Sequence, residues 1–442
     1  MGAELNIRRM HSAAPHFDRE LEALTGIGAE TADVTEAAAQ IVTAVKERGD
    51  AALVEFTNRF DGTRVTGIGE LRLHPEEFRQ AFDSLTDERR TALEDAAARI
   101  DGYHRRQARE SWSYEDELGN RLGARVTALD RVGVYVPGGL AAYPSTVLMT
   151  IVPARVAGVG EVVVTMPTPS GARNPMVLAA LHLVGVTEAY AIGGAQAVAA
   201  LAWGTETIGA VDKILGPGNA YVAAAKRQVY GKTGIDLIAG PSEILIVTDG
   251  TAPMDWLAYD LFSQAEHDEL AQSLLLCPDR GYLDALATRM AALIGGRERR
   301  DIIARSLEGR GALIETASLE EAVEISNRIA PEHLMLAVRD PEALLENVRH
   351  AGAIFLGAHS PEVMGDYVAG PSHVLPTYGT ARFSSPLGVE DFQKRSSVIA
   401  LSPEGCRALS GTASVLARSE GLEAHALAAE VRDGRPEPRT GH

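Results

Sequence analysis

The amino-acid sequence predicts an α/β protein with two parallel-sheet units, a helical lead-in before them and a helical tail after them. Short β-branched runs alternate with helical stretches of about ten residues through most of the chain, which is the sequence sign of parallel strands joined by crossover helices. The length of 442 residues is more than one hydrophobic core usually organises. We therefore expect a protein with several domains.

The lead-in is expected to be helical. From residue 33 to residue 112, alanine-rich runs place apolar residues three and four positions apart, which is the helical period. Ser84 and Asp87 have the spacing of a capping box, in which two side chains satisfy free backbone N–H groups at a helix start. A helix is therefore expected from Ser84 through Ile100.

The strand candidates fall into two series. Strands of the first series are expected at residues 132–136, 162–165, 213–215 and 235–237. Strands of the second are expected at residues 243–247, 273–277, 333–338 and 353–356. A helix within the second series is capped by Ser318 and Glu321. After Pro386 the strand pattern stops, and a helical segment is expected up to a polar tail at residues 432–442.

The charge balance argues against polyanionic partners. Lys and Arg total 42 against 60 Asp and Glu, which gives a net charge of −18 and a sequence pI near 5.2. Such a surface repels the phosphates of nucleic acids and anionic lipids. Residues 132–154 are uncharged for long enough to span a bilayer, but Pro137, Pro144 and Pro153 interrupt them. We interpret this stretch as a strand, a loop and a buried helix, and expect neither a nucleic-acid nor a membrane partner.

Cysteine usage and the N-terminal residues favour a cytoplasmic protein. Cys277 and Cys406 are far apart and outside any CxxC pattern, so neither a disulfide framework nor a thiolate zinc cluster is expected. Residues 1–10 lack the apolar segment that a secretory signal needs.

A glycine-rich turn follows one of the expected strands. The sequence Gly216-Pro217-Gly218-Asn219-Ala220-Tyr221 opens a helix but lacks the third glycine of the GxGxxG dinucleotide fingerprint. Two glycines still let the backbone approach a phosphate at a helix N-terminus, where free amides favour an anion. An ordinary tight turn is the other interpretation. Two further turns, Gly138-Gly139 after Tyr135 and Gly193-Gly194 before Gln196, also follow expected strands, and ligands of parallel sheets bind at such strand ends.

Candidate metal ligands occur in the second half of the chain. Gln264 and His267 are three residues apart at the end of an expected helix, so they share one helix face and can reach one ion. Zinc accepts histidine nitrogen and carboxylate oxygen, which makes Asp366 and His425 natural further ligands. Each histidine taken alone also fits an ordinary hydrogen-bonded role.

Glu332 and His333 place an acid and a base side by side at the start of an expected strand. Adjacent strand residues point to opposite faces, but at a strand end both can face one cleft. Histidine titrates near neutral pH and can relay protons there. Ser242 lies in a turn without the GxSxG pattern of a nucleophile elbow, so we do not expect it to form an acyl-enzyme.

Taken together, these blocks resemble the histidinol dehydrogenase family in order and in spacing, over nearly the whole chain. The resemblance rests on Gly240-Pro241-Ser242-Glu243, Gln264-Ala265-Glu266-His267-Asp268, Pro331-Glu332-His333, Gly365-Asp366-Tyr367 with His373-Val374-Leu375-Pro376-Thr377, and Glu420-Gly421-Leu422 with His425. It implies two Rossmann-like units, one of them an incomplete dinucleotide-binding unit without the glycine fingerprint. It also implies an enzyme that oxidises L-histidinol through L-histidinal to L-histidine, the last two steps of histidine biosynthesis, with zinc and two NAD per product.

The resemblance also implies roles for individual residues. The zinc ligands, around one ion per site, are matched by Gln264, His267, Asp366 and His425. The catalytic pair is matched by Glu332 and His333. Substrate contacts are matched by Ser242, His373 and Glu420, together with the zinc ligands and His333. Dinucleotide contacts are matched by Tyr135, Gln196 and Asn219. Ser372, before His373, stands where the family more often has Asn, and none of these roles depends on it.

The implied domains are an N-terminal helical arm, a discontinuous first α/β domain with the catalytic and metal residues, an NAD-binding α/β domain and a helical tail. Their expected limits are 1–25, 26–134 with 242–386, 135–241 and 387–442. In the resembling family the tail crosses to the partner of a homodimer, so that two subunits share each active site. We expect the same arrangement here.

Two alternative functions use the same residues. A zinc-dependent hydrolase would use the same ligands, with Glu332 activating water and no dinucleotide. A non-catalytic scaffold would hold a structural metal in a closed coordination sphere. The dehydrogenase is favoured because Tyr135, Gln196 and Asn219 lie on strand-end loops of an expected parallel sheet.

Overall fold

Two mainly parallel sheets organise the larger of two units in this α/β protein. The structure is a computed structural model and describes residues 5–26, 32–138 and 143–432. One unit comprises Met1–Gln107 with Leu129–Phe392, and the other Ala108–Ala128 with Gln393–His442. The predicted fold class is confirmed.

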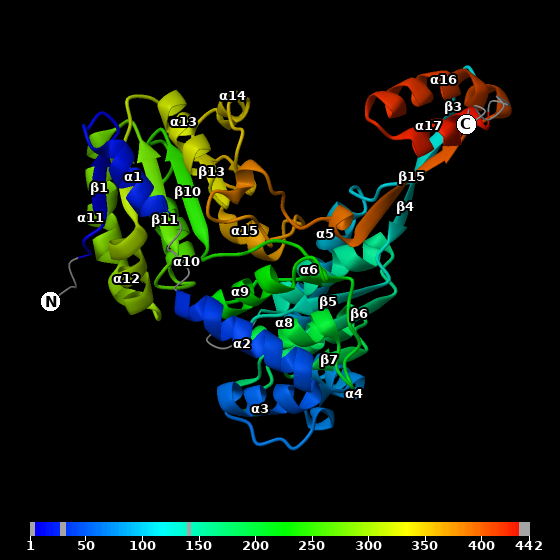
Figure 1. Ribbon diagram of the computed structural model, residues 1–442. Helices are drawn as coiled ribbons and strands as arrows, with labels where there is room; N and C mark the ends of the chain where they lie inside the picture. The colour runs from blue at the N-terminus through cyan, green and yellow to red at the C-terminus, as the bar shows by residue number, and fades with distance from the viewer. Residues whose placement is uncertain (1–4, 27–31, 139–142, 433–442) are drawn as a thin grey trace. The chain divides into compact units, whose positions relative to one another are not determined.

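One sheet, the β10 sheet, has the strand order β1-β12-β11-β10-β13-β14, and all its neighbouring strands are parallel. Its strands are β1 (Arg8–His11), β10 (Glu243–Thr248), β11 (Gln272–Cys277), β12 (Ala312–Glu315), β13 (His333–Ala337) and β14 (Ala353–Leu356). Strands β11 and β10 are the middle pair of this sheet, and Figure 1 shows them with helices around them.

Helices cover both faces of the β10 sheet. One face packs against α10 (Met254–Ala265), α11 (Arg280–Leu293) and α12 (Arg300–Arg310). The other packs against α1 (Phe17–Thr25), α13 (Leu319–Ile329) and α14 (Pro341–Leu345). Along β10, Ile244 and Ile246 face the first group of helices and Leu245 and Val247 the second. The run is continuously apolar because both faces are covered, and each aliphatic side chain buried in this way contributes about 1.5–3 kcal/mol. Helix α15 (Glu362–Tyr367) follows β14.

The other sheet, the β5 sheet, has the order β2-β7-β6-β5-β8-β9 and is parallel except for its edge strand β2. Its strands are β2 (Arg72–Leu73), β5 (Arg131–Tyr135), β6 (Glu161–Thr165), β7 (Glu188–Tyr190), β8 (Lys213–Leu215) and β9 (Gly234–Ile235). The helices of its core are α2 (Ala32–Arg48), α3 (Asp50–Asp61), α4 (Pro75–Asp83), α5 (Asp87–His104), α6 (Pro144–Ala157), α7 (Pro175–Leu183), α8 (Gly194–Trp203) and α9 (Ala220–Val229). The interpretation of residues 132–154 as strand, loop and buried helix is confirmed by β5 and α6, although 139–142 lie outside the described residues.

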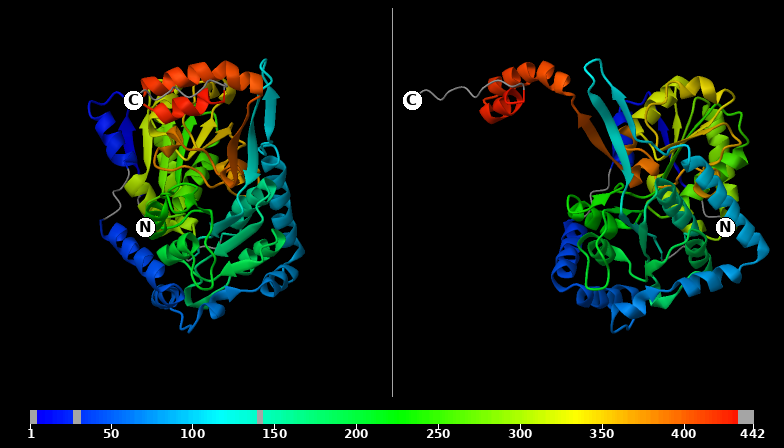
Figure 2. Two further views of the ribbon diagram at one scale, coloured as in Figure 1. Left: turned by 45° about the vertical axis from the view of Figure 1, so that its right-hand side comes forward. Right: turned by 90° about the vertical axis from the view of Figure 1, so that its right-hand side faces the viewer.

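The second unit is built on an antiparallel sheet of order β15-β4-β3. Its strands are β3 (Trp112–Glu115), β4 (Arg121–Ala128) and β15 (Gln393–Ala400), and they form a narrow ribbon in Figure 2. Helices α16 (Pro403–Ser419) and α17 (Glu423–Glu430) pack on each other. The expectation that the strand pattern stops after Pro386 is wrong, because β15 is a strand. Its sequence is polar and shows no alternation, since neither of its faces is buried.

The N-terminal segment also differs from expectation. Residues 8–11 form β1, which pairs with β12, so the segment before α1 is an edge strand and not part of a helical arm. Only Met10 of this strand is buried, which leaves no strand pattern to recognise. The cap of α5 is Thr86, whose hydroxyl accepts from Arg89 N, and not Ser84. The predicted cap at Ser318 is confirmed, since its hydroxyl accepts from Glu321 N.

The hydrophobic cores group the chain differently from the expected domains. Helices α2 to α5 share one core with the β5 sheet, whereas residues 26–134 were expected to join 242–386. The apolar faces of the first helices pack against a sheet whose main strands come later in the chain. The helical period shows that a helix has an apolar face, but it does not show which sheet that face covers. The domain limits themselves stay a prediction.

Five short 3₁₀ segments complete the described secondary structure, at Ile68–Leu71, Pro169–Gly171, Ile294–Gly296, Thr380–Arg382 and Val389–Phe392. Among the described helices, none combines the length and the apolar character that crossing a bilayer requires.

Candidate active site

The predicted acid and base lie at the amino end of β13, beside the amino end of β10 in the β10 sheet. His333 is the first residue of β13 and pairs in register with Ile244, the second residue of β10. Glu332 precedes it, and both side chains are buried. Ligands of open parallel sheets usually bind at the carboxyl ends of strands, so this site lies at the opposite edge of its sheet.

The imidazole of His333 is held in one tautomer. Its Nδ1 lies 2.9 Å from the carbonyl oxygen of Glu243, and a carbonyl only accepts, so Nδ1 carries the proton. Nε2 is 3.6 Å from Asp366 Oδ1, and Nδ1 is 3.6 Å from Glu332 Oε2. The predicted acid and base are therefore in contact, with Nε2 directed at a further carboxylate.

Glu243 and Glu332 bind each other reciprocally across β10 and β13. Glu243 N donates to Glu332 Oε2 at 2.8 Å, and Glu332 N donates to Glu243 Oε2 at 3.4 Å. Tyr378 N donates to the other oxygen of Glu243 at 3.2 Å. This arrangement fixes both the backbone and the carboxylate of Glu332.

A group of potential metal ligands adjoins His333. One ligand atom from each of His267, Glu362 and Asp366 lies within 4.8 Å of the others. Glu362 and Asp366 are four residues apart on α15, so they occupy one helix face. Gln264, at the end of α10, has a buried side-chain amide. In the amide orientation that gives both its N and its O a partner, the amide N donates to Glu362 Oε2 at 2.9 Å. The structure thus brings Gln264, His267 and Asp366 together as predicted, and adds Glu362.

Burial and charge perturb the acids of this site. Burial raises the pKa of Glu332 to about 8 and that of Glu243 to about 7. Burial also raises the pKa of Glu362 well above its ordinary value. The pKa of Asp366 is lowered, because its contact with His333 outweighs the effect of burial. A low-dielectric site disfavours ionised carboxylates unless a positive charge is near.

The histidines of the site respond differently to this environment. Burial lowers the pKa of His333, but the carboxylates of Glu362, Glu332 and Asp366 outweigh burial and hold that pKa well above its ordinary value. Burial lowers the pKa of His267 and of His373, so both favour the neutral form, which binds metals. Buried carboxylates beside neutral imidazoles are a donor set that suits a divalent cation such as zinc.

His373 joins this site to the helices of the β5 sheet. Its Nδ1 lies 3.0 Å from the carbonyl oxygen of Asp366, and its Nε2 lies 3.2 Å from Thr146 Oγ1, in the first turn of α6. Ser242 lies directly before Glu243, and its carbonyl accepts from Gln272 N at 2.9 Å. Ser242 and His373, two of the predicted substrate residues, therefore border the buried acids.

The three predicted dinucleotide residues lie at the carboxyl edge of the β5 sheet. Tyr135 ends β5, Gln196 lies in the first turn of α8, and Asn219 is the cap of α9, its Oδ1 accepting from Tyr221 N at 3.1 Å. The hydroxyl of Tyr135 accepts from Gly194 N at 3.1 Å. Burial raises the pKa of Tyr135 to about 12, so its hydroxyl keeps its proton at neutral pH. Gln196 is buried and its Oε1 has no hydrogen-bond partner within the described part of the chain.

Glycine is required at the turn before Asn219. Gly216 has a φ of +104°, and a Cβ there would lie 2.2 Å from the carbonyl oxygen of Tyr135. The turn after β8 therefore packs directly on the end of β5. This geometry brings the glycine-rich turn and Tyr135 together, as a ligand at this edge would require.

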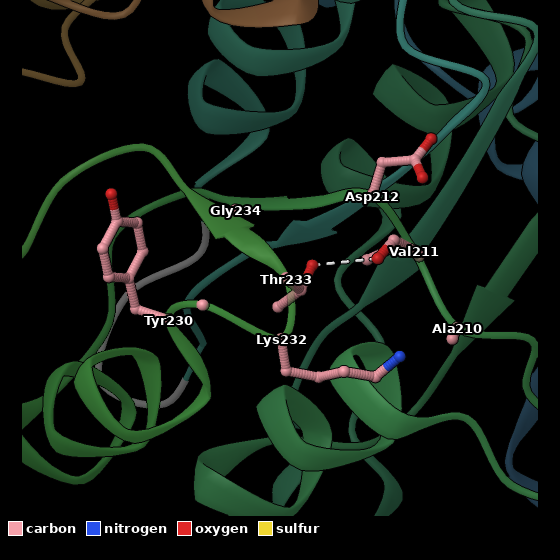
Figure 3. Close-up of a pocket in the computed structure, with 8 residues that line it drawn as sticks. Ala210, Val211, Asp212, Tyr230, Lys232, Thr233 and Gly234 are labelled. Carbon is pink, nitrogen blue, oxygen red and sulfur yellow. Dashed lines mark hydrogen bonds between the residues drawn. The ribbon is translucent and has the colours of Figure 1, made fainter. Parts of the chain in front are cut away.

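A hollow of about 490 Å³ lies at the other edge of the β5 sheet (Figure 3). Asp212 and Thr233, which line it, precede β8 and β9. The hydroxyl of Thr233 donates to Val211 O at 2.9 Å. This hollow is on the side away from the predicted dinucleotide residues, and we assign no ligand to it.

Glu420 and His425 belong to the second unit. Glu420 is the cap residue after α16, and His425 lies on α17, with both side chains exposed within this unit. Their roles as substrate contact and metal ligand stay predictions.

Two residues of the site were not singled out from the sequence. Glu362 could have been found from its spacing of four residues to Asp366 on one short helix. Glu243 could have been found as a charged residue at the head of the apolar strand Glu243–Thr248, because a buried unpaired carboxylate is rare.

Comparisons with known proteins identify the family of this chain. A profile described as histidinol dehydrogenase matches residues 27–433. The chain is 56% identical over 433 residues to a histidinol dehydrogenase of Pseudomonas fluorescens, covering 98% of both chains. It is 56% identical over 429 residues to one of Nitrosomonas europaea, covering 97% of this chain and 99% of that protein.

A solved structure of similar shape leads to the same family. The crystal structure of histidinol dehydrogenase from Elizabethkingia anophelis has a TM-score of 0.90 and 32% identity, covering 96% of this chain and 98% of that chain. Because the match extends over nearly the whole chain in sequence and in structure, the chain belongs to the histidinol dehydrogenase family and is an NAD-dependent oxidoreductase.

Proposed function

We propose that the protein oxidises L-histidinol through L-histidinal to L-histidine, with two NAD reduced per product and with zinc in the site. The observation that carries this proposal is the fixed geometry of His333. Its Nδ1 is bound to Glu243 O, and its Nε2 faces Asp366, which belongs to a group of potential ligands with Glu362 and His267. Family membership supports the substrate and the place in histidine biosynthesis.

In the first half-reaction, His333 acts as the base from its neutral form. A cation bound beside Glu362 and Asp366 would favour that form, because it would offset the carboxylates that raise the pKa of His333. His333 takes the hydroxyl proton of histidinol on Nε2 while the carbinol carbon gives a hydride to NAD, which leaves the aldehyde and NADH. The carbonyl of Glu243 holds Nδ1–H, so the proton can enter only at Nε2. Fixing the tautomer in advance lowers the cost of reaching the reactive geometry.

In the second half-reaction, Glu332 activates water. Addition of water to the aldehyde gives a hydrate, and loss of a second hydride from that carbon to a second NAD gives the carboxylic acid. A pKa raised to about 8 by burial lets Glu332 exchange protons near neutral pH, as general acid–base catalysis requires.

The proposed zinc ligands are Gln264, His267, Asp366 and His425, with Glu362 beside them. When bound, the ion would accept the imidazole and amine nitrogens of the substrate as ligands. It would also offset the charge of the buried carboxylates. His373, Ser242 and Glu420 would contact the substrate. The bonds from His373 to Asp366 and Thr146 support a role at the junction of the two sheets.

The NAD is proposed to lie at the carboxyl edge of the β5 sheet, against Tyr135, Gln196 and Asn219. The partnerless Oε1 of buried Gln196 supports this assignment, because a buried polar atom without a partner is costly until a ligand supplies one. The protonated hydroxyl of Tyr135 adds a hydrogen-bond donor there.

We further propose a cytoplasmic homodimer in which the helical tail of one subunit supplies Glu420 and His425 to the site of the other. The test is to mix His267→Asn and His425→Asn variants, each inactive alone, under conditions that exchange subunits. A mixed dimer has one site with both lesions and one with neither, so about a quarter of all sites should recover. No recovery after proven exchange would show that each subunit completes its own site.

The experiment that tests the reaction is the yield of NADH per histidinol consumed. We expect a yield of two, because both half-reactions use the same site. A yield of zero with intact, zinc-loaded protein would overturn the proposal.

A further inference from the structure

We propose that Lys226 and Asp236 form a buried clamp that holds the turn at residues 216–219 in the conformation that receives the dinucleotide. Both are positioning residues that act through the backbone of Gly216. The proposal rests on the assignment of NAD to the carboxyl edge of the β5 sheet.

The two side chains enclose the backbone of Gly216. Gly216 N donates to Asp236 Oδ2 at 2.7 Å, and Lys226 Nζ donates to Gly216 O at 3.0 Å. Lys226 Nζ also donates to Asp236 Oδ1. Each side chain is 2% exposed. The three groups therefore close a ring in which both polar backbone atoms of Gly216 have a charged partner.

Gly216 needs these partners because the sheet supplies none. The register between β5 and β8 ends with Val134 opposite Leu215, and that between β8 and β9 ends with Ile214 opposite Ile235. Gly216 is thus the first residue beyond the ladder, where buried backbone groups must find other partners. Bonds to charged groups are stronger than bonds between neutral ones, which suits a turn held in one conformation.

The clamp fixes more than one residue. Gly216 packs on the carbonyl of Tyr135, and the hydroxyl of Tyr135 binds Gly194 N at the neighbouring turn. Three residues after Gly216, Asn219 caps α9, the helix that also carries Lys226. Movement of Gly216 would therefore displace all the predicted dinucleotide contacts relative to one another.

A buried ion pair is a weak argument for stability, since desolvation offsets much of its attraction. A local role fits better here, because Lys226 and Asp236 both hydrogen-bond the backbone of one glycine, Gly216. The same sheet offers a matched control in Lys213, at the other end of β8, whose Nζ donates to the carbonyl and to Oδ1 of Asp391, both at 2.9 Å.

The experiment compares Lys226→Met with Lys213→Met in the full-length protein. Binding of NAD is measured calorimetrically without histidinol, and amide hydrogen exchange is followed for the segment 214–222. We expect Lys226→Met to weaken NAD binding about tenfold or more, as loss of a bond to a charged group at the turn implies. The same variant should speed exchange of that segment. In Lys213→Met both should stay within about twofold of the parent protein, even if the melting temperature falls.

Steady-state kinetics give a second readout. For Lys226→Met the KM for NAD should rise while the KM for histidinol stays unchanged, a split that a general loss of folded protein would not produce. If Lys226→Met does not fold, the double variant Lys226→Met/Asp236→Asn avoids an unpaired buried charge. It still leaves an acceptor for Gly216 N, so it should fold and show a smaller loss of NAD affinity in the same direction.

Asn219→Ala separates the two ways in which this inference can fail. If NAD binding is lost in Asn219→Ala and unchanged in folded Lys226→Met, the clamp is refuted and the proposed dinucleotide site stands. If neither variant changes NAD binding, the dinucleotide lies elsewhere and the assignment in the proposed function fails. Equal losses in Lys226→Met and Lys213→Met would reduce the pair to a structural role and overturn the proposal.

Discussion

The two six-stranded sheets present chemically opposite edges. The β5 sheet offers its carboxyl edge, where glycine turns pack around Tyr135 and the side chains of Lys226 and Asp236 bind the backbone of Gly216. The β10 sheet offers its amino edge, where the acids Glu243, Glu332 and Glu362 are buried beside histidines. One edge is shaped by the backbone, and the other by ionisable side chains.

This difference predicts that a bound cation would affect the amino edge of the β10 sheet more than the carboxyl edge of the β5 sheet. The carboxyl edge of the β5 sheet is satisfied internally apart from single groups such as Gln196 Oε1. The amino edge of the β10 sheet holds acids whose pKa values burial raises, so a bound cation would stabilise their ionised forms. Perturbations should therefore act on one edge at a time.

The largest expected effect is that of metal removal. Chelation should abolish oxidation of histidinol, because the acids and His333 would be left without the charge that balances them. NAD binding, measured by calorimetry, should change by less than about twofold, since the dinucleotide edge uses none of these ligands. Circular dichroism should show a retained fold. Full activity in the stripped protein would refute the metal assignment, and unfolding would make the metal structural.

Next in size is the effect of changing the acid–base pair. Glu332→Gln should slow oxidation of supplied histidinal by about 10²–10⁴-fold, the contribution of a general acid–base group. Oxidation of histidinol to the aldehyde should be slowed much less, whereas His333→Asn should damage both steps. Rapid-mixing measurements of each NADH burst distinguish the steps. Equal losses in both steps for Glu332→Gln would remove its separate role.

A smaller effect is expected at the other edge. Gly216→Ala adds a Cβ 2.2 Å from the carbonyl of Tyr135, at a φ of +104°. Gly231→Ala is the matched control, with a φ of +100° and open space around the new Cβ. Both should lose about 1 kcal/mol or more from backbone strain. Only Gly216→Ala should raise the KM for NAD, and a similar rise in both variants would show that strain alone explains it.

The smallest effect is expected from Glu243→Gln. The amide keeps an acceptor for Tyr378 N but weakens the bond from Glu332 N. Glu332 should therefore be held less firmly in place while its carboxyl group stays intact. We expect a fall in kcat of about tenfold. The control Asp249→Asn changes a carboxylate that accepts from Arg339 N at 3.0 Å, at the carboxyl ends of the same two strands. It should leave kcat unchanged, and a fall of the same size would contradict a positioning role for Glu243.

Much of the central architecture could be read from local patterns. The expected strands at 213–215 and 353–356 agree with β8 and β14. The expected strand at 243–247 agrees with β10, whose residues 244–247 are continuously apolar because both faces of the strand are buried. The contact between Glu332 and His333 also followed from their place at a strand start. The polar strands β1 and β15 were not predicted, because they are mostly exposed and their sequences show no alternation of apolar and polar residues.

The sequence by itself determined the number of parallel-sheet units, their apolar strands and the motifs proposed to carry the chemistry, because these depend on residues close together in the chain. Tertiary structure alone decided that α2 to α5 cover the β5 sheet, that Glu332 and His333 lie at the amino edge of the β10 sheet, and that Glu362 joins His267 and Asp366. It also decided that a distant lysine and aspartate close around Gly216. The physical reason is that burial and ionic contact depend on which elements pack together, and packing joins residues whose spacing in the chain carries no signal.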